Sequence, residues 1–168
     1  MQTLAKFFLF TSFFLTNLFA EPFEELPKFV LKDQNGISHS YKSCLGKNCF
    51  IMNCSSDSIV VCRKLGRKVY YKMLNRFFHD SDQPEFFLIV DTSTLFSGWK
   101  VWLSDKRKSG YERVLLDEKA EFSKLVSKDS LKISIGDQKY LPIFQKDYKE
   151  IGDSDLEQME KTIRSNRK

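Results

Sequence analysis

The pattern of apolar and polar positions predicts short buried strands separated by helices. Residues 50–52, 86–90 and 114–116 are short apolar runs, and such runs are typical of strands that are covered on both faces of a sheet. Between the first two runs, the chain after Ser58 repeats apolar side chains at helical period. The order strand, helix, strand predicts two parallel strands joined by a crossover helix.

The predicted helix after Ser58 has an apolar face and a basic face. The apolar face consists, four positions apart, of Val61, Leu65, Val69, Met73 and Phe77, with Cys62, Tyr70 and Leu74 alongside. The basic face consists of Arg63, Lys64, Arg67, Lys68 and Lys72. Asp57 and Ser58 are suited to cap the start of the helix. Gly66 weakens a helix by about 1 kcal/mol relative to alanine, so we expect it to allow close packing on the sheet.

Shorter patterns predict the other strands. Asn35-Gly36 lies between strand-like runs at 29–31 and 37–41, and this dipeptide in such a setting predicts a β-hairpin. Further strands are predicted at 131–135 and 140–144.

Three more segments complete the secondary structure. A turn is predicted at 146–149 and a short helix at 120–126. The last helix is expected to open with a capping box at 154–157. Between the strands at 86–90 and 114–116, one side of a further helix would carry Leu95, Trp99, Trp102 and Leu103. The two tryptophans are expected either to pack in the core or to form a binding face.

The N-terminus has the pattern of a secretory signal peptide. Lys6 precedes the apolar run FFLFTSFFLTNLFA, which ends at Ala20 before the polar Glu21. The run is shorter than the roughly 20 apolar residues that a membrane span needs. We therefore expect a signal peptide at 1–20, a single domain at 21–168, and a periplasmic or secreted protein. Leu18 is bulkier than the small residue preferred near a cleavage site, so the sequence leaves open whether the peptide is removed.

Composition and charge narrow the class of protein. A chain of 168 residues with 42% hydrophobic and 29% charged residues is long enough for one globular domain. Its net charge is +5, and removing residues 1–20, which hold one lysine and no acid, would leave +4. The basic residues are scattered among acids, as at 105–113, which favours a solvated surface over a nucleic-acid face. We expect no nucleic-acid partner and membrane anchoring only through an uncleaved signal peptide, and the mild positive charge leaves open a weak attraction to an anionic envelope surface.

The four cysteines carry the candidate chemistry. Cys44, Cys49, Cys54 and Cys62 allow three complete pairings in an oxidising compartment. Cys54 follows a predicted central strand and Cys62 lies in the first turns of the helix, where open α/β sheets hold their sites and a helix N-terminus favours a thiolate. Cys54 and Cys62 are the candidate redox pair, with Cys54 expected to be the more exposed. A bridge between them, and a structural one between Cys44 and Cys49, are both sterically conceivable.

The order of elements resembles the thioredoxin-like superfamily, in the exported redoxin branch that includes peroxiredoxins and the copper-chaperone SCO proteins. The resemblance covers nearly all of the chain after residue 20, through PKFVLKDQNG, LGKNCFIMNCSSDSIVVCRKLG, FFLIVDTS, VLLDEKAEFSKLV, PIFQKDYKEIG and DLEQMEKTI. It implies an α/β thioredoxin-like sandwich, with a mixed central β-sheet flanked by helices on both faces. Protein thiols or disulfides in the cell envelope are the partners that it implies.

The cysteine spacing departs from the patterns of that superfamily. Seven residues separate Cys54 from Cys62, whereas thioredoxins have two and SCO proteins have three. Compared with peroxiredoxins, Cys62 takes the place of the peroxidatic cysteine, but Ser55 replaces a proline and Ile59 replaces a threonine or serine. Lys139 is the nearest counterpart of the arginine of that family. These departures argue against peroxidase activity.

Three functions remain open on the sequence. The first is thiol-disulfide exchange by Cys54 and Cys62, and the second is a redox-inactive binding module whose cysteines are structural, with Cys62 simply a small residue on the buried face of its helix. The third is SCO-like copper delivery, which usually needs a histidine beside thiolates. His39 could approach, whereas His79 lies about 25 Å along the helix from Cys62. No cofactor is expected, and Asp91 and Asp117 are expected to cap turns.

Overall fold

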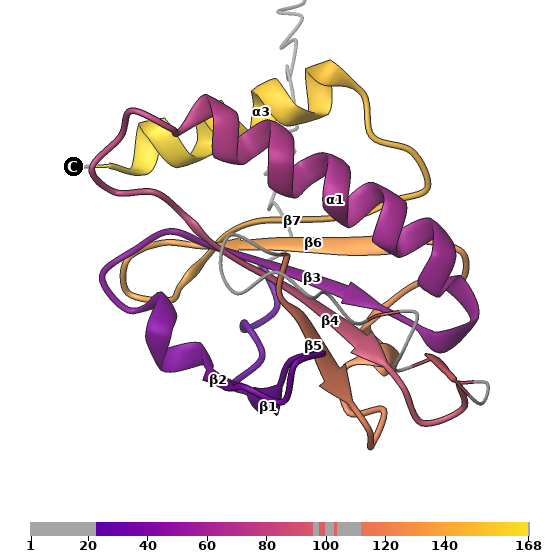
Figure 1. Cartoon of the computed structure of the whole chain (residues 1–168). Coiled ribbons are helices and arrows are strands. Elements are labelled where there is room, and N and C mark those ends of the chain that lie inside the picture. Colours follow the sequence, from indigo (N-terminus) through magenta and orange to yellow (C-terminus); the bar gives the residue numbers. More distant parts are fainter. Residues whose placement is uncertain (1–22, 96–97, 100–102, 104–111, 168) are drawn as a thin grey trace, which may run out of the picture.

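A five-stranded mixed β-sheet forms the centre of the molecule in the computed structural model, which describes residues 23–95, 98–99, 103 and 112–167 (Figure 1). The order of its strands is β5 (Val114–Asp117), β4 (Glu85–Asp91), β3 (Cys49–Cys54), β6 (Leu131–Gly136) and β7 (Pro142–Tyr148). The expected signal peptide at 1–20 and Trp102 lie outside the described residues.

Strand β3 lies in the middle of this sheet. It runs parallel to β4, with Cys54 opposite Val90, and antiparallel to β6, with Cys54 opposite Leu131. Strand β5 is parallel to β4 on its other side. All six residues of β3 are buried, because the sheet is covered on both faces. The parallel pair predicted from the two apolar runs is thus confirmed.

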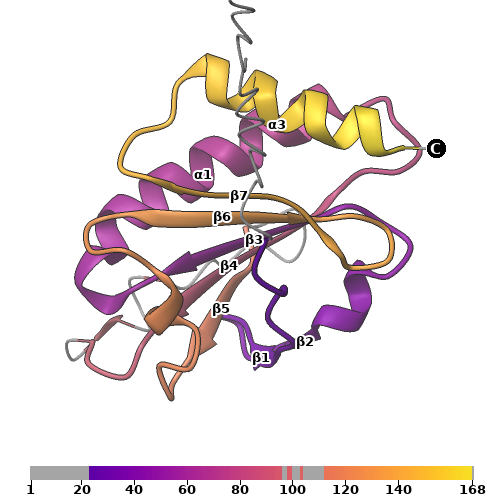
Figure 2. The same ribbon diagram turned by 180° about the vertical axis from the view of Figure 1, so that it is seen from behind.

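Two α-helices lie on one face of the sheet (Figures 1 and 2). Helix α1 (Ile59–Arg76) connects β3 to β4, and helix α3 (Asp153–Asn166) follows β7. The two helices share one apolar core with alternate residues of the strands, including Phe50, Met52 and Cys54 of β3. Cys62 and Met73 of α1 belong to the same core.

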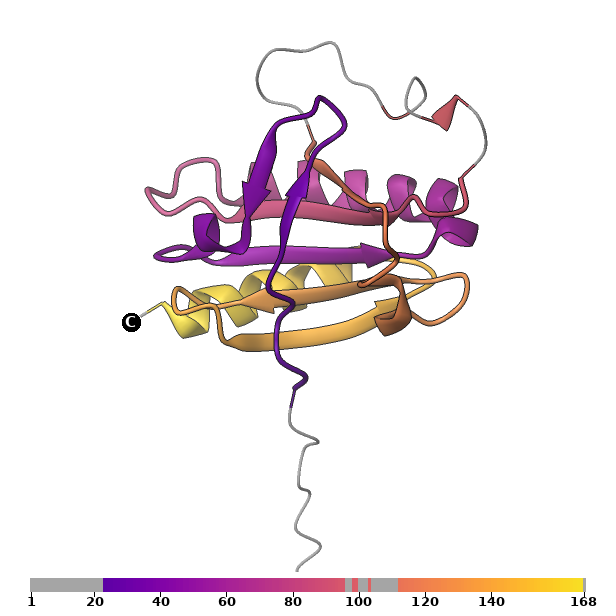
Figure 3. The same cartoon turned by 90° about the horizontal axis from the view of Figure 1, so that it is seen from below.

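A β-hairpin and short 3-10 turns cover the other face (Figure 3). Strands β1 (Val30–Lys32) and β2 (Ser38–Ser40) pair around the predicted Asn-Gly turn, and η1 (Tyr41–Cys44) follows them. This face has its own apolar core, to which Cys49 and Ile51 of β3 contribute. The remaining 3-10 turns are η2 (Ser56–Ser58) before α1 and η3 (Ser123–Leu125) after β5.

The expected fold class, a mixed sheet flanked by helices, is confirmed, with differences in detail. The helices were expected on both faces, but the α-helices among the described residues share one face, and turns cover the other. The helix expected at 120–126 is only the single turn η3. Strand β7 continues to Tyr148, where a turn was expected at 146–149, because residues 144–148 pair in register with β6.

Helix boundaries and faces also differ from expectation at single positions. Val61 was expected on the buried face of α1 but is 42% exposed; it lies in the first turn of the helix, where Ile59 and Cys62 are the residues that face the core. Helix α3 begins at Asp153, one residue before the expected capping box, and the Asp155 carboxylate accepts a hydrogen bond from the Gly152 N–H at 2.9 Å. Among the described residues, no helix combines the length and apolar character needed to cross a bilayer.

Candidate functional site

Cys54 and Cys62 are joined by a disulfide, with their Cα atoms 6.0 Å apart. Cys54 is the last residue of β3, and Cys62 is the fourth residue of α1. The seven residues between them turn back on themselves through η2, which brings the start of the helix over the end of the strand. This bridge therefore lies at the carboxyl end of the central strand, where open α/β sheets place their sites.

Both sulfurs of this bridge belong to the core. Cys54 is 1% exposed and Cys62 is fully buried, so the expectation that Cys54 is exposed is wrong. Cys54 Sγ lies 3.2 Å from the Ser55 carbonyl oxygen, and Cys62 Sγ lies 3.4 Å from that of Ser130. A sulfur in a disulfide has no proton to donate, but the thiols that form on reduction could each donate a hydrogen bond to these oxygens.

Residues 55–61 separate the disulfide from solvent, and we call them the 55–61 segment. Two side-chain hydrogen bonds hold this segment: Thr94 Oγ1 lies 2.8 Å from Ser56 Oγ, and the hydroxyls of Ser55 and Ser58 lie 3.2 Å apart. Within the turn, the Ser58 N–H donates to the Ser55 carbonyl oxygen at 3.1 Å and the Ile59 N–H donates to that of Ser56. Ser58 precedes the helix but makes no capping hydrogen bond with its side chain. Beside the disulfide, Val60 is 69% exposed. The covering of the pair is thus a short 3-10 turn and the first residues of α1, in which Ile59 packs in the core while Val60 and Val61 face solvent.

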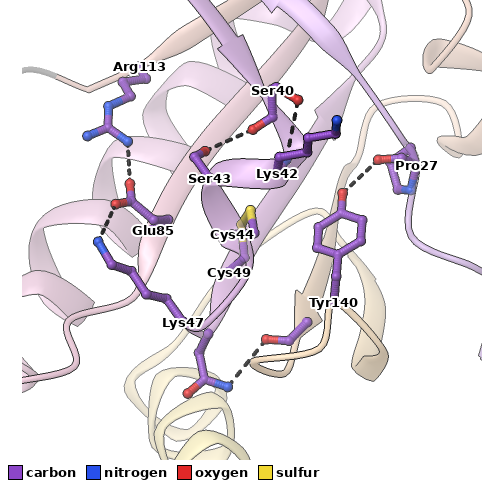
Figure 4. Close-up of a disulfide and its surroundings, with 12 residues drawn as sticks. Pro27, Ser40, Lys42, Ser43, Cys44, Lys47, Cys49, Glu85, Arg113 and Tyr140 are labelled. Atoms are coloured by element: carbon purple, nitrogen blue, oxygen red, sulfur yellow. Dashed lines mark hydrogen bonds and ion pairs between the residues drawn. A yellow bond between two sulfur atoms is a disulfide. The ribbon is translucent and has the colours of Figure 1, made fainter.

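A second disulfide joins Cys44 to Cys49 at the other end of β3 (Figure 4). Their Cα atoms are 5.5 Å apart, and both residues are fully buried in the core of the hairpin face. The two bridges therefore lie at opposite ends and on opposite faces of one strand, because Cys49 and Cys54 are five positions apart. The Cys44–Cys49 bridge ties η1 to the sheet, while the Cys54–Cys62 bridge ties α1 to it.

The surroundings of the Cys44–Cys49 bridge are held by side chains from several elements (Figure 4). Glu85 accepts hydrogen bonds from Lys47, at 3.0 Å, and from Arg113. Burial by itself would raise the pKa of Glu85, but these two hydrogen bonds outweigh it, so its pKa lies below the ordinary value. Tyr140 Oη donates to the Pro27 carbonyl oxygen at 2.6 Å. This bridge thus lies in a well-braced part of the fold.

The histidines do not meet the Cys54–Cys62 pair. His39 lies on the hairpin face, where Nε2 is 2.8 Å from Asp33 Oδ2 and the ring is 5.8 Å from that of Phe87. His79 follows the far end of α1. No group of three or more metal-ligating side chains occurs within the described ranges. The cysteine and histidine set expected for SCO-like copper binding is not brought together.

Other residues that the sequence analysis named cap turns, lie in a connection or pack against the core. Asp91 Oδ1 accepts hydrogen bonds from the N–H and hydroxyl of Ser93, and Asp117 Oδ2 accepts one from the Phe122 N–H, so both carboxylates cap turns as expected. Lys139 lies in the β6–β7 connection, beyond the Cys49 end of β3 and away from Cys62. Trp99 is half-buried against the helix-side core.

One cavity has no counterpart in the sequence analysis. It measures about 570 Å³ and lies between the hairpin and the end of β5, with Leu31, Gln34, Trp99 and Leu116 among its lining residues. No cysteine lines it. Its walls come from residues 30–36, Trp99 and residues 116–121, and no local sequence pattern predicts that these distant parts of the chain meet. The burial of Cys54 was missed for a related reason, since it depends on how the 55–61 segment turns.

Comparisons with solved structures find many chains of similar fold. Thiol:disulfide interchange protein DsbE from Chlorobium tepidum, as that chain is described, aligns with a TM-score of 0.63 at 14% identity, over 87% of this chain and 97% of that one. Yeast Sco1 with copper bound aligns with a TM-score of 0.61 at 15% identity, over 84% and 93%. Peroxiredoxin Q from Xanthomonas campestris aligns with a TM-score of 0.64 at 10% identity, over 88% and 100%.

Sequence comparison adds nothing to this likeness. No protein-family model matches the chain, and no curated protein matches it in sequence. Structural likeness at 10–15% identity establishes the fold and leaves the activity to be argued from the site. Its mixed five-stranded sheet with helices packed on it matches these structures over most of their length, and the chain thus has a thioredoxin-like fold.

Proposed function

We propose that this chain is an exported thiol-disulfide exchange protein whose redox pair is Cys54 and Cys62. The observation that carries the proposal is the position of this disulfide, which joins the carboxyl end of the central strand to the first turns of α1. The solved structures of similar fold include proteins described as thiol-disulfide oxidoreductases. Protein thiols or disulfides in the cell envelope would be the partners, and the apolar run at 1–20 would direct export.

The exchange would proceed by two thiolate attacks. A thiolate of a partner dithiol attacks one sulfur of the Cys54–Cys62 bond, which forms a mixed disulfide and releases the other cysteine as a thiolate. The second thiol of the partner then loses its proton and attacks the mixed disulfide. The partner leaves as a disulfide, and Cys54 and Cys62 end as a dithiol that has gained two electrons and two protons.

Access to the sulfurs would require the 55–61 segment to open. With Cys54 only 1% exposed and Cys62 buried, no partner thiolate reaches either sulfur in the closed form. Its side-chain hydrogen bonds come from serine and threonine hydroxyls, of which only that of Ser58 belongs to a buried residue, and Ile59 is its one side chain in the core. Segments with few buried contacts open locally at a free energy well below that of global unfolding.

A redox-inactive binding module is the second candidate function. The burial of all four cysteines favours it, because a structural bridge needs no access. The two functions differ in how fast the native protein reacts with a small dithiol. Local opening allows reduction without unfolding, whereas a structural bridge is reduced only when the whole domain unfolds.

The test is reduction of the native protein by dithiothreitol, followed by pulsed alkylation and mass spectrometry. Cys44–Cys49 is an internal control, because it is equally buried but lies in a braced region. The proposal predicts that Cys54–Cys62 is reduced at least tenfold faster than Cys44–Cys49. Equal rates that both follow global unfolding would contradict it and favour the binding module.

A further inference from the structure

The outer face of α1 is a basic surface. Over its 18 residues the helix has six basic side chains and no acidic one. Lys64, Lys68 and Lys72 follow one another at intervals of four, so they lie in a row about 12 Å long on one side of the helix. All three are exposed. Helix α3 lies beside α1 in the same layer (Figures 1 and 2), and its acids reach this side of α1, where Asp155 attracts Lys68 and Glu160 pairs with Arg76 at 2.6 Å.

This row is part of a shallow groove with an apolar floor. The groove is lined by Lys64, Arg67, Lys68, Tyr71, Lys72 and Asn75. Tyr71 is 45% exposed, with its ring 5.0 Å from that of Tyr70. An aromatic ring with a polar tip, surrounded by the alkyl stems of lysines, suits the boundary between lipid headgroups and acyl chains.

Neighbouring acids neutralise only part of the row. Glu112 is buried and pairs with Arg67 at 2.8 Å, and Lys68 donates to the Ile151 carbonyl oxygen. On the flank, Asp155 pairs with Lys146. Lys64 and Lys72 have no ion pair among the residues that the structure describes, so their charges face solvent.

We propose that this α1 basic face binds the surface of an anionic phospholipid membrane. A bilayer surface needs only charges that face one plane, which a single exposed helix side supplies. All six described residues that line the groove are exposed, whereas selective recognition of an acidic peptide would require a buried polar side chain among them. The sequence left open a weak attraction to an anionic surface through scattered charges; the α1 basic face gives that attraction a defined place, which would orient the domain. This inference does not depend on the activity of Cys54 and Cys62.

Lysine acetylation of the full chain tests the proposal directly. The protein is treated with a water-soluble acetylating reagent in the presence of phosphatidylglycerol or phosphatidylcholine vesicles, and each lysine is quantified by mass spectrometry. We expect phosphatidylglycerol vesicles alone to protect Lys64 and Lys72 several-fold, and added salt to abolish the protection. Lys42 and Lys139 are internal controls, since both are exposed and lie outside α1. Absence of this protection, or equal protection of the controls, would overturn the proposal.

A pair of charge variants provides the second measurement. Lys64→Gln/Lys72→Gln and Lys42→Gln/Lys139→Gln each remove two exposed charges, and residues 1–20 are the same in both. Each lysine near an anionic surface contributes about fivefold to the affinity, so the first variant should bind phosphatidylglycerol vesicles roughly thirtyfold more weakly. Binding to phosphatidylcholine vesicles is subtracted in each case. The second should bind almost as the parent does. Equal weakening of both, or protection of Lys64 and Lys72 by polyglutamate but not by vesicles, would overturn membrane binding.

Discussion

At the scale of single residues, Gly136 shows how closely the N-terminal segment packs on the sheet. A Cβ at Gly136 would lie 2.6 Å from Leu26 Cδ1, a distance that no real contact shows. Leu26 is 5% exposed and belongs to the core of the hairpin face. A side chain at position 136 would therefore have to displace the buried end of Leu26, and this contact, not a turn, is what the glycine accommodates.

Gly136→Ala should lower the free energy of unfolding by about 1–3 kcal/mol, because the added methyl displaces Leu26. Urea denaturation followed by circular dichroism measures the change. The matched control is the same substitution in a Leu26→Ala background, where the space is vacant and the additional cost should be smaller. An equal cost in both backgrounds would show that the contact with Leu26 is not the cause.

Because the pKa of Glu85 is shifted in the folded protein, we expect the free energy of unfolding to depend on pH. Its pKa is lowered in the folded protein by Lys47 and Arg113, which outweigh burial. The two ion pairs therefore stabilise the fold fully above the ordinary value of 4.5, and this contribution is lost as the pH falls through the lower folded value. Both cations are substantially exposed, so we expect about 1 kcal/mol or less.

Glu85→Gln should remove this part of the pH dependence. Thermal unfolding between neutral pH and pH 3 would show a smaller loss of stability in the variant than in the parent. Glu118→Gln serves as the control, because Glu118 is exposed and has no ion pair in the described ranges. A parent and Glu85→Gln variant with the same acid profile would exclude a stabilising role for the Glu85 ion pairs.

At the scale of elements, the 55–61 segment controls access to the disulfide in our account. Thr94→Ala removes the hydrogen bond to Ser56, which is worth about 0.5–1.5 kcal/mol. If the segment opens for the exchange, the native protein should be reduced by dithiothreitol several-fold faster, with little change in global stability. Thr162→Ala, which removes a hydrogen bond within α3, should leave the reduction rate unchanged. An unchanged rate in Thr94→Ala would mean that reduction does not depend on opening of this segment.

Elements with a strong local pattern could be predicted from the sequence, and those fixed by tertiary contacts could not. The β3–α1–β4 unit was predicted because Phe50–Met52 and 86–90 are apolar throughout and α1 is amphipathic. The end of β7 was not predicted as a strand, because Lys146 and Asp147 are polar and pair with β6 at the solvent-facing edge of the sheet. Cys54 and Cys62 form the disulfide that the sequence had allowed. Their burial could not be predicted, because it depends on the fold of residues 55–61, which have no periodic pattern.

At the scale of the whole molecule, the two disulfides should differ in role more than in stability. They close loops of similar length, with sequence separations of 5 and 8, so the loop-entropy model assigns each about 2–3 kcal/mol. Chemical denaturation of Cys44→Ser/Cys49→Ser and Cys54→Ser/Cys62→Ser should show losses of that size or larger in both. Only the second variant should lose the fast reaction with dithiols. Loss of the fast reaction in the first variant as well would place the chemistry elsewhere or make it depend on the Cys44–Cys49 brace.

The most direct test of the redox account is the reduction potential of each bridge in the native protein. Equilibration with glutathione buffers, followed by alkylation and mass-spectrometric mapping, gives both potentials from one sample. We expect the Cys54–Cys62 bridge to have a reduction potential well above about −300 mV, in the range of working redox pairs. The Cys44–Cys49 bridge should have a lower potential and resist reduction. If Cys54–Cys62 also stays oxidised below that potential, its bridge is structural, and the redox function is contradicted.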